Sequence, residues 1–254
     1  MNTKEKMGKA LITGASSGIG ATYAKRLSER GYDLLLVARS KDKLDELATE
    51  IQFEHDVEVE TLKADLTNSS DLKKVIERLE QDRTITLFLN NAGIPAPGSL
   101  LDSKFDTLSD VIDLNVKAAS QLAVAAGKNF RQNRNGKIIN ISSVLALMPE
   151  QVNGVYSASK SYVLVLAQAL ANELKPFDVQ VQAVLPGATR TAIWEKSGVD
   201  INQLPPEMIM EVEDMVDAAL KGLDNHELVT IPPLKAPQRW QELEAARLNV
   251  GPFL

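Results

Sequence analysis

Short apolar runs alternate with segments of helical periodicity along most of the chain. Residues 34–38 form a continuous apolar run, as expected for a strand covered on both faces of a sheet. The next segment, residues 41–52, carries its apolar residues on one helical stripe. The pattern predicts strands at residues 10–13, 34–38, 57–62, 86–90, 137–142 and 179–185, and helices at about residues 18–30, 41–52, 71–79, 108–130 and 155–174. This alternation predicts an α/β fold with a doubly wound parallel sheet, in a single domain spanning residues 1–254.

Two of the predicted helical segments, residues 111–126 and 162–171, are apolar on nearly all sides. A helix that covers one face of a sheet needs only one apolar stripe, so the second apolar face predicts contact with another subunit. We therefore expect a homo-oligomer, either a homodimer or a homotetramer.

The chain is moderately acidic, with a formal net charge of -6, and it contains no cysteine. Nucleic acids and anionic membranes are bound by clustered lysine and arginine, so we expect no nucleic-acid partner and no membrane partner. The polar N-terminus carries no signal peptide, and no apolar stretch is long enough to span a membrane. We expect a cytoplasmic protein with no metal site, because neither of its two histidines has further ligands nearby in the sequence.

The first predicted strand ends in a turn that contains three glycines, Gly14, Gly18 and Gly20, and leads directly into a helix. Glycine lets the backbone approach a pyrophosphate closely, and a helix N-terminus offers free N–H groups and a partial positive charge. The turn therefore predicts a dinucleotide site. The same letters, Gly14-Ala15-Ser16-Ser17-Gly18, also fit the nucleophile elbow of hydrolases. That alternative needs a histidine base, for which only His226, close to Asp224, is a candidate.

The second predicted strand ends with Ala38, Arg39 and Ser40. NAD-binding folds normally place a carboxylate there to bind the ribose diol, whereas NADP-binding folds offer an arginine to the 2′-phosphate. Ala38 stands where the carboxylate is expected, and Arg39 and Ser40 supply a cation and a hydroxyl. The predicted cofactor is NADP(H).

Tyr156 and Lys160 lie four residues apart in a predicted helix, so their side chains share one face. An ammonium and an oxidised nicotinamide nearby are expected to lower the pKa of the phenol and make it a general acid/base. Ser143 follows the fifth predicted strand, at the edge of the sheet where ligands bind, and its hydroxyl can donate to a substrate carbonyl oxygen.

The chain resembles the short-chain dehydrogenase/reductase family in its single-domain, Rossmann-fold form. The motifs that carry the resemblance are Thr13-Gly14-x-x-x-Gly18-x-Gly20, Asp65-Leu66, Asn90-Asn91-Ala92-Gly93, Asn115, Ser143, Tyr156-x-x-x-Lys160 and Pro186-Gly187. The catalytic residues that the resemblance implies are Asn115, Ser143, Tyr156 and Lys160. The cofactor-binding residues are Gly14, Ser16, Ser17, Gly18, Ile19, Gly20, Arg39, Ser40, Asp65, Leu66, Asn91, Ala92, Gly93, Tyr156, Lys160, Pro186, Gly187, Thr189 and Thr191.

In this family Asp65 would bind the adenine amino group, and Asn91 with Ala92 would line the adenosine ribose. Lys160 would hold the nicotinamide ribose and lower the pKa of Tyr156, and Asn115 would hold a water that relays protons to Lys160. The segment from Pro186 to Thr191 would wrap the nicotinamide.

Two segments near the C-terminus vary in the family. Residues 187–212 would form the substrate loop, with an apolar wall made from Ala192, Ile193, Trp194, Val199, Ile201, Leu204, Met208, Ile209 and Met210. The tail, residues 232–254, should contain a helix from about 237 to 248 that buries Trp240, Leu243 and Leu248, either over the substrate entrance or against another subunit.

These observations predict an oxidoreductase that transfers a hydride between NADP(H) and a carbonyl or secondary alcohol substrate, with Tyr156 as general acid/base. The alternative is a non-catalytic NADP(H)-binding sensor or scaffold with the same fold.

Overall fold

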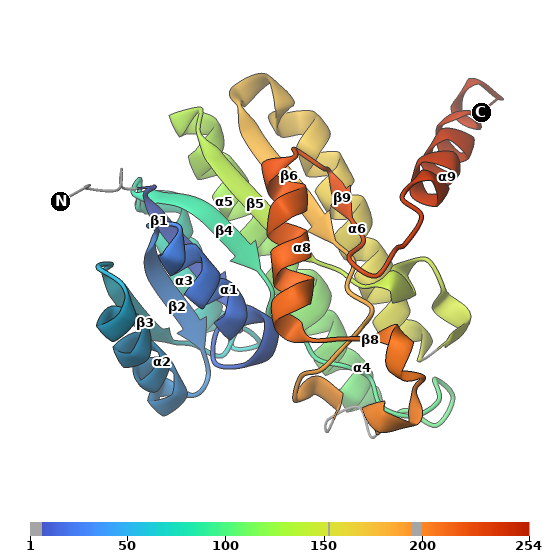
Figure 1. The fold of residues 1–254 in the computed structure, drawn as a ribbon, viewed down its shortest axis with the longest axis horizontal. Helices are drawn as coiled ribbons and strands as arrows, with labels where there is room; N and C mark the ends of the chain where they lie inside the picture. The colour runs from blue at the N-terminus through green and yellow to red at the C-terminus, as the bar shows by residue number, and fades with distance from the viewer. Residues whose placement is uncertain (1–6, 152, 195–199, 254) are drawn as a thin grey trace.

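Seven parallel strands form the central sheet, in the order β3-β2-β1-β4-β5-β6-β9 (Figure 1). The computed structural model describes residues 7–151, 153–194 and 200–253, so Val199 of the predicted pocket wall lies outside the described residues. The strands are β1 (Lys9–Thr13), β2 (Asp33–Ala38), β3 (Val59–Lys63), β4 (Ile85–Asn90), β5 (Gly136–Ile141), β6 (Val179–Val184) and β9 (Val229–Thr230). The two short strands β7 (Ala188–Thr189) and β8 (Ile209–Met210) pair separately. β1 pairs with both β2 and β4, so the strand order reverses there, which is where doubly wound sheets bind ligands.

Helices cover both faces of this sheet (Figure 1). On one face α3, α5 and α6 pack their apolar residues against the strands, and on the other α1, α2 and α8 do so. The helices are α1 (Gly18–Glu29), α2 (Lys41–Glu54), α3 (Ser69–Gln81), α4 (Phe105–Ile112), α5 (Ala119–Asn133), α6 (Gly154–Leu174), α8 (Val212–Asp224) and α9 (Gln238–Leu248). The prediction of a doubly wound parallel α/β fold is confirmed.

The predicted single helix at residues 108–130 is wrong in one respect. α4 and α5 are separated by a π-helical turn, Asp113–Ala118, in which the backbone takes one extra residue per turn. The Asn90 side chain donates to the Ala119 carbonyl oxygen (3.0 Å) and so provides a partner at the end of this turn. The turn carries Asn115, one of the predicted catalytic residues.

The C-terminal helix α9 also differs from its prediction. It projects from the rest of the domain (Figure 1), and none of its residues is buried. Trp240 packs in part against the core, and Gln168 of α6 donates to Glu244 (3.3 Å), but Leu243 is 49% exposed and Leu248 is 62% exposed. The predicted stripe is therefore not buried within the single chain, and its burial against another subunit stays a prediction.

The outer faces of the two most apolar helical regions are uncovered in the single chain. Ile112, Val124, Tyr162 and Val165 all expose large parts of their side chains. These residues belong to α4, α5 and α6, for which a subunit contact is predicted, and the oligomer stays a prediction. None of the helices in the described part of the chain is long and apolar enough to span a membrane.

Candidate active site

The glycine turn between β1 and α1 is built around close backbone contacts. Gly14 and Gly18 have φ angles of 67° and 53°, which side chains other than glycine rarely adopt. The Asn91 amide donates to the carbonyl oxygens of Thr13 (2.9 Å) and Gly14 (3.3 Å), which ties the turn to the end of β4. Ser17 precedes α1 but makes no capping hydrogen bond with its side chain, so the helix N-terminus is available to an anion.

A substitution at Gly20 tests whether the close backbone contacts of this glycine turn are needed for binding. A Cβ atom added there would lie 2.4 Å from the Gly14 carbonyl oxygen and 2.7 Å from the Asn91 amide nitrogen, so the turn would have to open. We expect Gly20→Ala to weaken dinucleotide binding at least about tenfold and to lower the melting temperature, as overpacking costs ~1–3 kcal/mol. Fluorescence titration and thermal unfolding measure the two effects.

The matched control is Gly127→Ala in α5, where an added Cβ meets only ordinary contacts at 3.5 Å and beyond. Within a helix this change stabilises by roughly 0.5–1 kcal/mol and should leave binding unchanged. If the two variants had the same dinucleotide affinity and the same melting temperature, the close approach at Gly20 would be contradicted.

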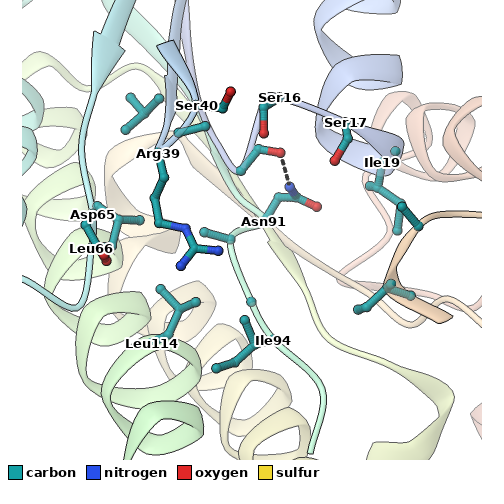
Figure 2. Close-up of a pocket in the computed structure, with 18 of the residues that line it drawn as sticks. Ser16, Ser17, Ile19, Arg39, Ser40, Asp65, Leu66, Asn91, Ile94 and Leu114 are labelled. Carbon is teal, nitrogen blue, oxygen red and sulfur yellow. Dashed lines mark hydrogen bonds between the residues drawn. The ribbon is translucent and has the colours of Figure 1, made fainter. Parts of the chain in front are cut away.

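A pocket of about 590 Å³ opens beside this turn, at the carboxyl ends of β1, β2 and β4 (Figure 2). The predicted cofactor residues that line it are Gly14, Ser16, Ser17, Gly18, Ile19, Arg39, Ser40, Asp65, Leu66, Asn91, Ala92, Gly93 and Thr191. The predicted residues that do not line it are Gly20, Pro186, Gly187, Thr189 and the four catalytic residues Asn115, Ser143, Tyr156 and Lys160. The pocket is thus the adenosine and pyrophosphate end of the predicted site. Thr191 approaches it closely, since its Cγ2 lies 3.2 Å from where a Cβ on Gly18 would sit.

Two cations at this pocket make no hydrogen bond or ion pair with the described residues. Arg39 extends from the end of β2 into the pocket, between Asp65 on one side and Ile94 and Leu114 on the other (Figure 2). The second cation is Lys43, in the first turn of α2, which the sequence analysis missed. In the sequence Lys43 does not differ from other lysines at a helix start, and its place at the pocket is seen only in the fold.

Asp65 faces Arg39 across the pocket and is held ionised. The Thr67 hydroxyl (2.7 Å) and the Thr67 N–H (3.0 Å) both donate to Asp65 Oδ1. These hydrogen bonds lower the pKa of Asp65 below its usual value, and the charge of Arg39 adds to the effect.

Tyr156 and Lys160 lie in the first two turns of α6, as predicted. The Lys160 Nζ donates to the Ile141 carbonyl oxygen (2.9 Å) and lies 5.7 Å from the centre of the Tyr156 ring. The Ser142 hydroxyl donates to the Lys160 carbonyl oxygen (2.6 Å), which ties α6 to the end of β5. Ser143 follows directly, with a buried hydroxyl that accepts from the Leu145 N–H (3.2 Å).

Asn115 reaches the same place from the π-helical turn. Its side chain accepts from the Ile94 N–H (2.9 Å) and donates to the Ile94 carbonyl oxygen (2.9 Å) and to the Ser159 hydroxyl (3.1 Å). Gly93 packs between the two polar groups, since a Cβ there would lie 3.2 Å from Asn115 Oδ1 and 3.4 Å from Lys160 Nζ. The end of β4, the π-helical turn and α6 therefore meet at Lys160.

The predicted lowering of the Tyr156 pKa invokes both Lys160 and an oxidised nicotinamide, so it stays a prediction for the complex, and the protein alone behaves differently. Burial raises the pKa of Tyr156 to about 12 and lowers the pKa of Lys160 to about 8. Removing a phenol from water disfavours its ionised form, and removing an ammonium from water disfavours its protonated form. A further positive charge brought into the site would lower the pKa of Tyr156.

This raised pKa predicts the titration of the free protein. Because a raised pKa keeps the phenol protonated to higher pH, Tyr156 should remain neutral at about pH 10.5, where an ordinary tyrosine is mostly ionised. The tyrosinate absorbance of the wild type and of Tyr156→Phe should therefore be the same at that pH. An extra ionised tyrosine in the wild type would contradict the effect of burial.

The geometry overturns the hydrolase alternative. Asp224 forms an ion pair with Arg30 (2.8 Å), just past the C-terminal end of α1, whereas Ser16 precedes the N-terminal end of that helix. Twelve helical residues separate the two ends by roughly 18 Å. His226 therefore cannot act on Ser16. Within the described residues no group of three or more histidine, aspartate or glutamate side chains could hold a metal ion.

The segment after β6 closes the far side of the site. The Pro186 carbonyl oxygen accepts from the Val144 N–H (3.0 Å), and the Trp194 indole donates to the Thr189 carbonyl oxygen (2.8 Å). The buried Thr189 hydroxyl donates to the Gly187 carbonyl oxygen (3.2 Å), so the Thr189 side chain is hydrogen-bonded within its own turn. Trp194 thus anchors the start of the predicted substrate loop.

Comparison with known proteins agrees with this geometry. The family model described as short chain dehydrogenase matches residues 8–202. An uncharacterized oxidoreductase of Staphylococcus epidermidis is 30% identical over 91% of this chain and 98% of its own length. A short-chain dehydrogenase from Sphingobium yanoikuyae, solved in complex with NADPH, is 48% identical with a TM-score of 0.94, over 96% of this chain and 94% of that chain. A bulky-bulky ketone specific alcohol dehydrogenase from Comamonas testosteroni is 43% identical with a TM-score of 0.89, over 97% and 94% of the two chains.

Proposed function

The chain belongs to the short-chain dehydrogenase/reductase family of oxidoreductases, and we propose that it uses NADP(H) to interconvert a ketone and a secondary alcohol. The observation that carries the proposal is the meeting of Asn115, Tyr156 and Lys160 beside a pocket with a glycine turn and two cations that form no hydrogen bond or ion pair with the described residues. The turn, which an added Cβ would fill, fits a dinucleotide. When bound, the nicotinamide supplies or accepts the hydride.

Each catalytic side chain has a proposed part in proton transfer. The Tyr156 hydroxyl gives its proton to the carbonyl oxygen of the substrate as that oxygen gains charge, and takes it back in the reverse direction. The Ser143 hydroxyl donates a hydrogen bond to the same oxygen. Lys160, with a pKa lowered to about 8 by burial, can pass a proton to Tyr156 near neutral pH, and Asn115 holds its surroundings in place.

The preference for NADP(H) over NAD(H) is proposed from Arg39 and Lys43. Both line the pocket without a partner among the described residues, and Ala38 offers no carboxylate to a ribose diol. The NADPH complex of the Sphingobium yanoikuyae protein supports the same cofactor.

The substrate is proposed to be a ketone with two bulky, apolar substituents. The likeness to the Comamonas testosteroni alcohol dehydrogenase supports this class. So do the partly exposed apolar side chains of the proposed substrate loop, among them Ile193 and Met208. The loop, within residues 187–212, and the tail belong to the same single domain in this proposal.

The test is NADPH oxidation, followed at 340 nm, with ketones whose two substituents grow from methyl to phenyl. We expect kcat/KM to rise with the size of both substituents. Tight NADPH binding with no turnover on any ketone, aldehyde or diketone would instead favour a non-catalytic sensor.

A further inference from the structure

Asn153, which immediately precedes α6, makes hydrogen bonds in two directions. Its Oδ1 accepts from the Val155 N–H (3.1 Å) and caps the first turn of α6. Its Nδ2 donates to the Ser103 hydroxyl (2.9 Å) and to the Gly98 carbonyl oxygen (3.4 Å). Asn153 is 4% exposed, whereas Gly98 lies at the surface, so these bonds are partly buried. Asn153 therefore joins two segments that are far apart in the sequence.

Residues 98–103 form a turn that is held together by its own hydrogen bonds. The Ser103 hydroxyl donates to the Ser99 carbonyl oxygen (2.8 Å), and the Ser99 hydroxyl donates to Asp102 (2.5 Å). A Cβ on Gly154 would lie 3.4 Å from the Leu100 side chain, so the turn packs directly on the start of α6. The next residue of the turn, Leu101, is 96% exposed.

The other end of the same segment is held by Asn115. Ile94, which lines the cofactor pocket, makes both its backbone hydrogen bonds to the Asn115 side chain. The chain from Ile94 to Ser103 thus crosses from the cofactor pocket to the helix that carries Tyr156, with one buried asparagine at each end. Neither asparagine carries a charge, so this arrangement adds no charge beside Tyr156.

We propose that Asn153 is a positioning residue, which ties the turn of residues 98–103 to the first turn of α6 and so fixes one wall of the substrate site relative to the Tyr156 hydroxyl. The inference rests on the proposed function, since it assigns this wall to the ketone substrate. Asn153 touches neither the substrate nor the cofactor in this proposal.

Two single changes separate the cap from the tether. Asn153→Ser keeps an oxygen that can cap α6 but loses the amide donor, and Ser103→Ala removes the acceptor of the same bond. We expect each to lower kcat/KM for a bulky ketone about tenfold, mainly through KM, because misplacing a substrate by about 1 Å is costly. The double variant should lose less than the sum of the two single losses, since both changes remove the Asn153–Ser103 bond. Each change also removes one bond of its own, from Asn153 to the Gly98 carbonyl oxygen or from Ser103 to the Ser99 carbonyl oxygen. NADPH affinity should not change.

Asn153→Ala, which loses the cap as well, should also lower kcat, because Tyr156 lies in the turn that the cap stabilises. Ser109→Ala, at an exposed residue of α4, is the control and should behave as the wild type. Additive losses in the double variant, or variants that melt earlier but keep the wild-type kcat and KM, would overturn the inference.

Hydrogen exchange tests the tether without turnover. The amides of residues 98–103 should lose protection in Asn153→Ser and in Ser103→Ala, while the first turn of α6 keeps it in Asn153→Ser. Unchanged protection of the turn would overturn the inference. If the two variants lose protection in this way but the wild-type protein reduces no ketone, the result contradicts the proposed function and leaves the tether intact.

Discussion

Tyr156→Phe is expected to reduce kcat by about 10²–10⁴-fold while NADPH binds as tightly as in the wild type. The change removes one oxygen, the only atom of the side chain that can carry the proton. The ring remains to fill its place on α6, so the fold and the cofactor pocket, which Tyr156 does not line, are preserved. Single-turnover reduction of a ketone and fluorescence titration with NADPH measure the two quantities.

Tyr162→Phe is the matched control, because it deletes the same atom from the same helix. Tyr162 is 42% exposed, and its hydroxyl accepts a hydrogen bond from the Ser120 hydroxyl (2.9 Å). Its loss should cost roughly 1 kcal/mol of stability at most and leave kcat unchanged. If Tyr156→Phe kept the rate of the control, a different group would have to supply the proton.

Arg39→Asp is expected to weaken NADPH binding by about a hundredfold or more and to weaken NADH binding much less. The change removes a cation from the pocket and adds a carboxylate that would repel a 2′-phosphate. Charge-assisted hydrogen bonds are each worth roughly 1.5–3 kcal/mol, which accounts for a loss of this size. Dissociation constants for both cofactors, measured at one salt concentration, give the ratio.

Lys43→Ala should weaken NADPH binding about tenfold, because it removes the second cation without adding a repelling charge. Lys41→Ala is the control of equal charge: Lys41 lies two residues away, does not line the pocket, and is paired with Asp45. Equal losses of NADPH and NADH affinity in Arg39→Asp would remove the argument for a phosphate-specific site.

Much of the site follows from local patterns in the sequence. Gly14, Gly18 and Gly20 stand between a strand and a helix, where their spacing alone indicates close backbone contacts. A tyrosine and a lysine four residues apart, such as Tyr156 and Lys160, are common on helices. This pair indicates an active site only because a parallel sheet brings Asn115 and the end of β5 to the same edge. These are the features that sequence reasoning reached.

Other features depend on the folded environment and could not be predicted. The π-helical turn does not alter hydrophobic periodicity enough to be seen over six residues. Lys43 looks like any solvated lysine at a helix start until the pocket beside it is known. The pKa of Tyr156 is set by burial, which a sequence does not show, and the exposed stripe of α9 reflects how little of the domain that helix meets.

The π-helical turn also has a consequence for comparing this chain with its relatives. One residue more than an α-helix requires is stored at residues 113–118, so α4 and α5 are out of phase by about one residue, or roughly 100° around the axis. A relative that lacks this extra residue would align with both helices across a one-residue gap. An asparagine aligned with Asn115 would then point in a different direction from the helix axis. Deleting a single residue here would therefore keep both helices and still rotate Asn115 away from Ile94.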